Sequence, residues 1–123
     1  MESFRDLIAW QKAMVLATDV YRATDRFPRE EMYGLTSQLR RAAVAVPSDI
    51  AEGKGRISKK EFIQMLARAR GSACEVETQL EISKNLGFLQ AEMFMSLAEQ
   101  CSEVGRLVNG LIKSVQRSLR AES

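Results

Sequence analysis

Two pairs of carboxylates have a spacing that suits a divalent metal site. Asp49 and Glu52 are three residues apart, and Glu77 and Glu81 are four apart, so each pair shares one face of a helix. Facing helices could bring both pairs around Mg²⁺, and such a metal site could hydrolyse nucleotides. Such spacings are also common on exposed helices, and the chain has no histidine to act as a general base. A magnesium hydrolase is therefore the weakest hypothesis, and we predict a non-enzymatic protein without a cofactor.

Phosphate binding is the second chemistry that the residues suggest. Lysine and arginine gather around the second predicted connection, at Lys54, Arg56, Lys59 and Lys60. Lys59 and Lys60 fall in the first turn of a predicted helix, where the helix dipole disfavours cations, so helix stability does not explain them. We interpret these four residues as a candidate site for the phosphate backbone of a nucleic acid.

A second basic stripe lies near the C-terminus. Its members return to nearly the same helical azimuth, and they are Arg106, Lys113, Arg117 and Arg120. Glu92 and Glu99 share that azimuth earlier in the segment, and acid-first, base-last order also stabilises a helix through its dipole. The stripe is therefore either a stabilising helix face or a second part of a nucleic-acid interface.

A polar stripe in the second predicted helix suggests a paired network. Gln38, Arg41, Ser48 and Glu52 lie within about a third of a turn around the helix, interleaved with small residues. Because buried polar groups are normally paired, we expect Arg41 to bind a carboxylate, either Glu52 or Glu75. With Asp49, these residues form a predicted structural network or subunit contact, which we favour over a catalytic site.

Four amphipathic helices are predicted to position these groups. Apolar residues recur at spacings of three and four over residues 4–24, 28–53, 59–86 and 91–118, with no alternating β pattern. Ser3 and Ser58 begin capping-box patterns, and Gly87 suits a helix end. Pro47 predicts a kink near residues 43–47, or two helical pieces that meet there. The expected fold is all-α: an antiparallel up-down four-helix bundle, one domain over residues 1–123.

Composition is that of an ordered globular protein, and it excludes a disordered or collagen-like chain. Of the 123 residues, 46% are hydrophobic and 28% charged, with a net charge of +2. Residues 29–70 carry nine Lys and Arg against five Asp and Glu, whereas residues 71–103 carry one against six. No apolar run suits a membrane span or signal peptide, so we expect a cytoplasmic protein. Cys74 and Cys101 are expected to be buried free thiols.

Surplus apolar residues predict self-association. They lie beyond a single stripe in the first and last helices, at Ile8, Ala9, Val15, Leu16, Met93 and Met95. Small residues also run through the third helix, at Ala67, Ala69, Gly71, Ser72, Ala73 and Cys74. They favour a tight crossing inside the bundle, and a subunit contact is the alternative.

Several blocks of sequence resemble one known family. They are Phe4-Arg5-Asp6-Leu7, Trp10-Gln11-Lys12-Ala13, Phe27-Pro28, Glu31, Tyr33-Gly34-Leu35-Thr36, residues 38–43, Pro47-Ser48-Asp49-Ile50-Ala51-Glu52-Gly53, Gly55-Arg56, Phe62, Gly71-Ser72 and Glu75. They cover most of the chain, and the block ending at Gly53 is specific. The chain thus resembles the four-helix-bundle proteins of the 23S rRNA intervening-sequence family. Where that family commonly has Ser and Asn, this chain has Ala45 and Asp49, so a contact that relied on the amide becomes acidic or is lost.

The resemblance implies a small bacterial bundle that assembles as a homopentamer. Some family members are encoded within large-subunit ribosomal RNA genes, and more distant relatives assist a reverse transcriptase and contact nucleic acid through a basic surface. The main hypothesis is therefore an oligomer that offers a basic surface to structured RNA or a nucleoprotein complex. The alternative is a protein-only scaffold. Neither hypothesis involves a membrane or an evident small-molecule substrate.

Overall fold

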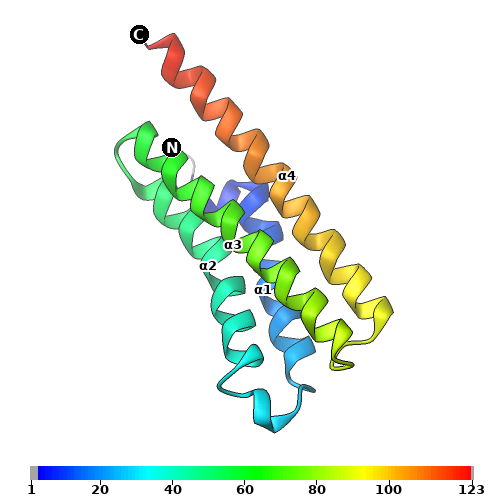
Figure 1. Cartoon of the computed structure of the whole chain (residues 1–123). Helices are drawn as coiled ribbons and strands as arrows, with labels where there is room; N and C mark the ends of the chain where they lie inside the picture. Colours follow the sequence, from blue (N-terminus) through cyan, green and yellow to red (C-terminus); the bar gives the residue numbers. More distant parts are fainter. Residues whose placement is uncertain (1–2, 123) are drawn as a thin grey trace.

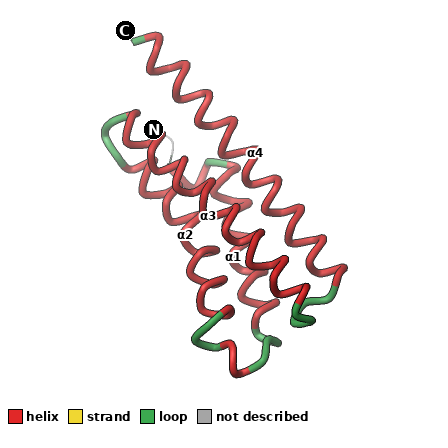
Figure 2. The backbone as a smooth tube through the Cα atoms, in the orientation of Figure 1, coloured by secondary structure: helices red, strands yellow, loops and turns green. Residues whose placement is uncertain are grey.

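Four long α-helices form the chain, which the computed structural model describes over residues 3–122. They are α1 (Ile8–Thr24), α2 (Leu35–Gly55), α3 (Lys59–Asn85) and α4 (Ala91–Ala121), and two short 3₁₀ turns accompany them, η1 (Phe4–Asp6) and η2 (Arg29–Glu31). Figure 1 shows the chain reversing direction after each helix. Figure 2 shows helices and loops, and no strand occurs between residues 3 and 122. The predicted all-α bundle is confirmed.

The first helix begins later than its sequence pattern predicts. Ser3 makes the expected capping box with Asp6, but this box starts η1 instead of a long helix. Leu7 is extended, with ψ of 123°, and α1 starts at Ile8. The extended residue separates a polar cap from the amphipathic segment, so one periodic pattern forms two elements.

The second helix also starts later, at Leu35 instead of Pro28. Pro28 begins only η2, which suits its fixed φ angle. The backbone of Gly34 is neither helical nor extended, and the Glu31 carboxylate accepts a hydrogen bond of 3.1 Å from the Leu35 N–H. The helix then continues through Pro47 to Gly55 as one element, and a kink at Pro47 stays a prediction.

Local caps define both ends of α3. The Ser58 hydroxyl accepts a hydrogen bond from the Glu61 N–H at 3.3 Å, which is one half of the predicted capping box. The Glu61 carboxylate pairs with Arg56 and not with the Ser58 N–H, so the other half is not formed within residues 3–122. At the other end Gly87 has a φ of +82°, and the Phe88 N–H donates to the Ser83 carbonyl at 2.9 Å. This is a Schellman motif, which glycine permits because it has no Cβ.

One apolar face of each helix contributes to the core. Its largest fully buried aliphatic residues include Leu16, Leu39, Ile50, Leu66, Leu80 and Leu97. Burying each such side chain contributes about 1.5–3 kcal/mol. Of the small residues in α3, Ala69 and Ala73 are in this core, whereas Gly71 and Cys74 are exposed. Only one face of this run of small residues therefore packs at the helix crossing inside the bundle.

The last helix is longer than predicted. It ends at Ala121 instead of residue 118, and its 31 residues span about 46 Å. Figure 1 shows its C-terminal turns extending beyond the α2–α3 connection. No helix within residues 3–122 is long and apolar enough to cross a membrane.

Candidate nucleic-acid interface

A groove of about 360 Å³ lies where the α2–α3 connection meets the C-terminal half of α4. Apolar side chains of Phe62, Leu111 and Val115 line it, together with serine hydroxyls. Three of the four predicted loop cations also line it, and these are Lys54, Arg56 and Lys59. Lys60 is exposed outside the groove. The structure therefore brings most of the sequence-predicted loop cluster to one mixed apolar and basic surface.

Arg56 is bound by carboxylates of its own chain. Its guanidinium makes a short hydrogen-bonded ion pair with Glu52 and lies 3.5 Å from a carboxylate oxygen of Glu61. The hydrogen bond with Glu52 and the charge of Glu52 raise the pKa of Arg56. Glu61 therefore serves Arg56 in addition to offering its backbone N–H to the α3 cap. The charge of Arg56 is therefore offset by two carboxylates, which makes Arg56 less available to a phosphate than the sequence suggests.

Lys59 ties the loop to the end of α4. Its ammonium donates to the Ser118 hydroxyl at 2.7 Å and also pairs with the Glu122 carboxylate. Lys54 differs, since its ammonium lies 5.9 Å from the centre of the Phe62 ring and forms no ion pair within residues 3–122. Lys60 likewise has no hydrogen bond or ion pair in the described part of the chain. Lys54 and Lys60 are thus the loop cations available to an external anion.

The basic stripe of α4 points away from this groove. Lys113 and Arg117 lie about half a turn around the helix from the groove-lining Leu111 and Val115. Both cations are exposed, and neither has an ion pair among the described residues. The stripe and the loop cluster therefore share one end of the molecule but occupy different faces.

Arg106, at the start of the stripe, is held within its own helix. Its guanidinium donates to the Ser102 hydroxyl at 2.7 Å and lies 3.3 Å from the Glu99 carboxylate. This contact matches the stabilising interpretation of the stripe at that position. Arg120 also makes an interaction within the structure. Of the four residues in the stripe, Lys113 and Arg117 are therefore the better candidates for binding an external anion.

The polar network predicted around Arg41 is not formed within the chain. Arg41 is exposed and has no hydrogen bond or ion pair within residues 3–122, so its expected pairing with Glu52 or Glu75 is wrong. Gln38 is also exposed. The reason is that the stripe faces solvent in one chain, so its polar groups need no internal partner. A subunit contact through this face stays a prediction.

Asp49 is the one partly buried member of that predicted network. Desolvation raises the pKa of Asp49, and the positive charge of Arg68 partly opposes the increase. Within residues 3–122, no three histidine, cysteine, aspartate or glutamate side chains converge to hold a metal ion. The magnesium site hypothesised from Asp49, Glu52, Glu77 and Glu81 is therefore absent from the described chain.

Sequence reasoning missed two features of the basic end. Ile57 is fully exposed beside the loop cations, although an isolated isoleucine in a connection carries no periodic signal. The pairing of Lys59 with Glu122 joins residues that are far apart in sequence, and only the packing of α3 against α4 brings them together. The Glu52–Arg56 pair, by contrast, could have been recognised from its spacing of four residues.

The fold is also found in a crystal structure of a protein of unknown function from Bacteroides thetaiotaomicron, which is described as a member of the S23 ribosomal protein family. The two chains are 21% identical with a TM-score of 0.80, and the match covers 86% of this chain and 96% of the other. At this identity the likeness shows the fold alone. No curated protein matches the sequence. The family model described as 23S rRNA-intervening sequence protein matches residues 5–110, which is most of the chain. The chain therefore belongs to the 23S rRNA-intervening sequence protein family.

Proposed function

We propose that this protein is a non-enzymatic homo-oligomer, assembling as a pentamer, that offers a basic surface to structured RNA or a nucleoprotein complex. One observation carries the RNA-binding part. At the end of the bundle where α4 extends past the α2–α3 connection, Lys54, Lys60, Lys113 and Arg117 have no carboxylate partner among the described residues. Unpaired exposed cations attract phosphates without first breaking an internal ion pair.

Exposed apolar residues support self-association. Ile8 and Val15 are seven residues apart on one face of α1 and are 59% and 53% exposed. Met95 of α4 is also exposed, whereas Met93 lines a separate groove between α1 and α4, and Ala9 and Leu16 are buried in the core. Exposed apolar residues on a small bundle favour burial against other subunits. Three of the six residues that suggested self-association from sequence, Ile8, Val15 and Met95, are thus available for it.

Matched pairs of substitutions test the RNA contact. The double variant Lys54→Gln/Lys60→Gln removes unpaired loop cations, whereas Arg56→Gln/Lys59→Gln removes cations that already pair with internal carboxylates. Binding of a fluorescein-labelled RNA hairpin is measured by anisotropy between about 50 and about 200 mM KCl. We expect the first variant to flatten the plot of log affinity against log salt by roughly 1.5 units, because each lost phosphate contact removes roughly 0.7–0.9. The second variant should change the slope less.

Arg29, at the opposite end of the bundle, supplies the control. Arg29→Gln removes an exposed positive charge and should leave the salt dependence of RNA binding unchanged. Equal effects of all these substitutions would indicate a response to net charge alone. A chain in which Lys54, Arg56, Lys59 and Lys60 are all neutralised but which binds RNA with unaltered affinity and slope would contradict the proposal.

A protein-only scaffold is the second candidate function. The pairing of Arg56 and Lys59 with internal carboxylates favours it, because these charges then stabilise the loop and the end of α4. In that case the protein would self-associate normally and the RNA hairpin would not bind. The same anisotropy measurement therefore separates the two candidates.

A further inference from the structure

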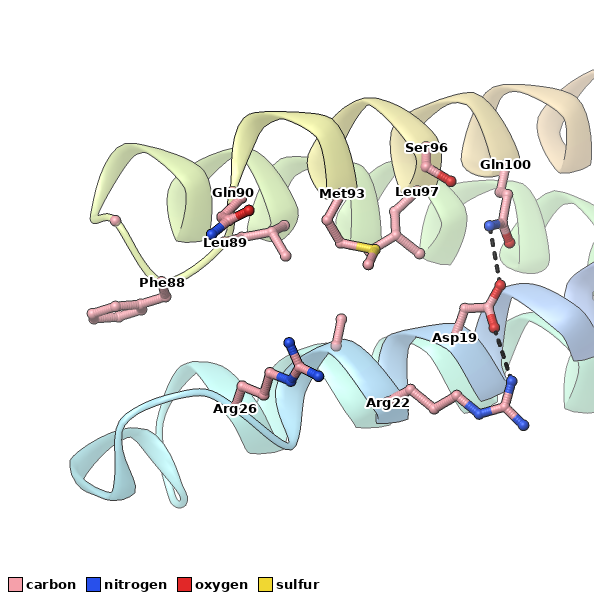
Figure 3. A pocket seen from close by; sticks show the side chains of 12 residues that line it. Asp19, Arg22, Arg26, Phe88, Leu89, Gln90, Met93, Ser96, Leu97 and Gln100 are labelled. Atoms are coloured by element: carbon pink, nitrogen blue, oxygen red, sulfur yellow. Dashed lines mark hydrogen bonds and ion pairs between the residues drawn. The ribbon is translucent and has the colours of Figure 1, made fainter.

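A larger groove, of about 630 Å³, lies between α1 and α4 at the opposite end of the bundle from the basic groove. Figure 3 shows Arg22 of α1 and Arg26, in the turn just after α1, on one side, and Met93 and Leu97 of α4 on the other. Its volume lies within the roughly 300–1,000 Å³ that is typical of small-molecule sites. The proposed RNA contact lies elsewhere, and the match to the family assigns no role to this groove.

The middle of the groove is apolar. Ala23, Leu89, Met93 and Leu97 line it, and Leu89 and Leu97 belong to the buried core. Met93 is half exposed at its edge. Such a lining excludes water from an apolar ligand but gives a polynucleotide backbone nothing to bind.

One end of the groove is positive and unpaired. The Arg26 guanidinium has no hydrogen bond or ion pair within residues 3–122, and Figure 3 shows it directed toward α4. The neighbouring Asp25 does not neutralise it, because Asp25 lies 3.7 Å from Arg40. Nearby, α4 begins after Gln90 without a side-chain cap, and its positive dipole end offsets the negative end of α1, which stops two residues before Arg26.

The other end is closed by a polar bridge. The Gln100 amide donates to the Asp19 carboxylate at 3.2 Å, and the same carboxylate lies 3.5 Å from Arg22 (Figure 3). The Gln100 Oε1 atom is buried and has no hydrogen-bond donor in the described part of the chain. This end presents acceptors, and Arg22 is already paired, so an anion is disfavoured there. An amphipathic anion fits the groove in one orientation only.

We propose that this groove binds a medium-chain alkyl carboxylate, such as a free fatty acid. Its carboxylate would pair with Arg26 beside the start of α4, where an arginine can donate two parallel hydrogen bonds. Its alkyl chain would cover Ala23, Leu89 and Met93 and end before the Asp19–Gln100 bridge. The site is independent of the RNA contact and of its cations.

Methionine methyl NMR tests this site, because the chain provides an internal control. The protein is labelled with ¹³C-methyl methionine and titrated with sodium decanoate. Met93 lines the groove, whereas the exposed Met95, two residues away, does not. We expect a saturable shift of the Met93 resonance and little change at Met95. Decanol and decyltrimethylammonium, which lack the negative charge, should bind more weakly.

Two substitutions complete the test. Arg26→Gln should weaken decanoate binding by about fivefold, the upper range for a partly exposed ion pair. Arg29→Gln, which removes a nearby charge outside the groove, should leave it unchanged. Equal and unsaturated shifts of Met93 and Met95, or equal affinity for decanol, would overturn the proposal. The proposal would also be overturned if the Met93 resonance shifted on protein dilution and not on addition of decanoate. That result would assign the groove to contact with a second copy of the chain.

Discussion

At the scale of single residues, the two cysteines have opposite environments despite similar sequence contexts. Cys101 is buried in the core, and desolvation, together with the charge of Glu77, raises its pKa to about 12. Cys74 is exposed, so the expectation that both thiols are buried is wrong for this residue. The reason is its azimuth: Cys74 follows the core residue Ala73 by one position, which turns it about 100° away from the core.

We predict that one thiol per chain reacts with Ellman's reagent under native conditions near pH 8. Cys74 should react rapidly, because it is accessible, and Cys101 should react only after unfolding, because it is buried and protonated. In Cys74→Ser the rapid phase should disappear, and in Cys101→Ser it should persist. Equal rates for both thiols in the native protein would contradict this environment.

The raised pKa of Cys101 predicts that the folded chain loses stability at high pH. The folded chain holds the Cys101 proton up to about pH 12, whereas the unfolded chain releases it near the ordinary pKa of 9.0. The stabilising contribution is therefore fully present below pH 9 and is lost as the pH rises toward 12. Urea unfolding of the wild type and of Cys101→Ser at pH 8 and pH 10.5 should show a smaller pH-dependent decrease in the variant. Identical decreases would show that Cys101 does not contribute.

At the scale of secondary-structure elements, Gly53 permits the close approach of α2 and α3. A Cβ atom at this position would lie 2.8 Å from the Met65 Cβ and 2.9 Å from a ring carbon of Phe62. Gly53→Ala should therefore destabilise the bundle by about 1–3 kcal/mol, although alanine is the better helix former. Gly71→Ala is the matched control, because no atom lies within 4 Å of its added Cβ, and it should stabilise the chain by up to about 1 kcal/mol. Urea unfolding measures both, and equal changes would refute the close-approach argument.

Local signals explain which parts of the helices could be predicted. The Ser58 cap, the Gly87 stop and the apolar stripe of α4 depend on neighbours within a few turns, and each appears where its residues predict it. The start of α2 at Leu35 could not be read from periodicity, because Pro28 and the acidic residues after it suit a 3₁₀ turn as well as an α-helix. The exposed face of Arg41 depends on how α2 is rotated within the bundle, which the spacing of polar residues alone does not determine.

At the scale of the whole molecule, the cations proposed to contact RNA gather at one end. The α2–α3 connection and the last turns of α4 form the basic end. The acidic segment over residues 71–103 carries six Asp and Glu against one Lys and runs to the opposite end, which it reaches through the α3–α4 connection. The candidate cations could be identified from the sequence, but their internal pairing could not, because Lys59 meets Glu122 only after α4 has packed against α3. The unpaired cations of the basic end are the physical basis for placing RNA there.

The most direct test of an RNA-binding oligomer is a native mass spectrum of protein purified at low salt without nuclease. It reports the number of subunits and any retained nucleic acid in one measurement. We expect five copies of the 13.8 kDa chain carrying RNA. Nucleic acid should dissociate as the salt concentration is raised, because its contacts are to phosphates. A monomer free of RNA would contradict both the assembly and the RNA contact.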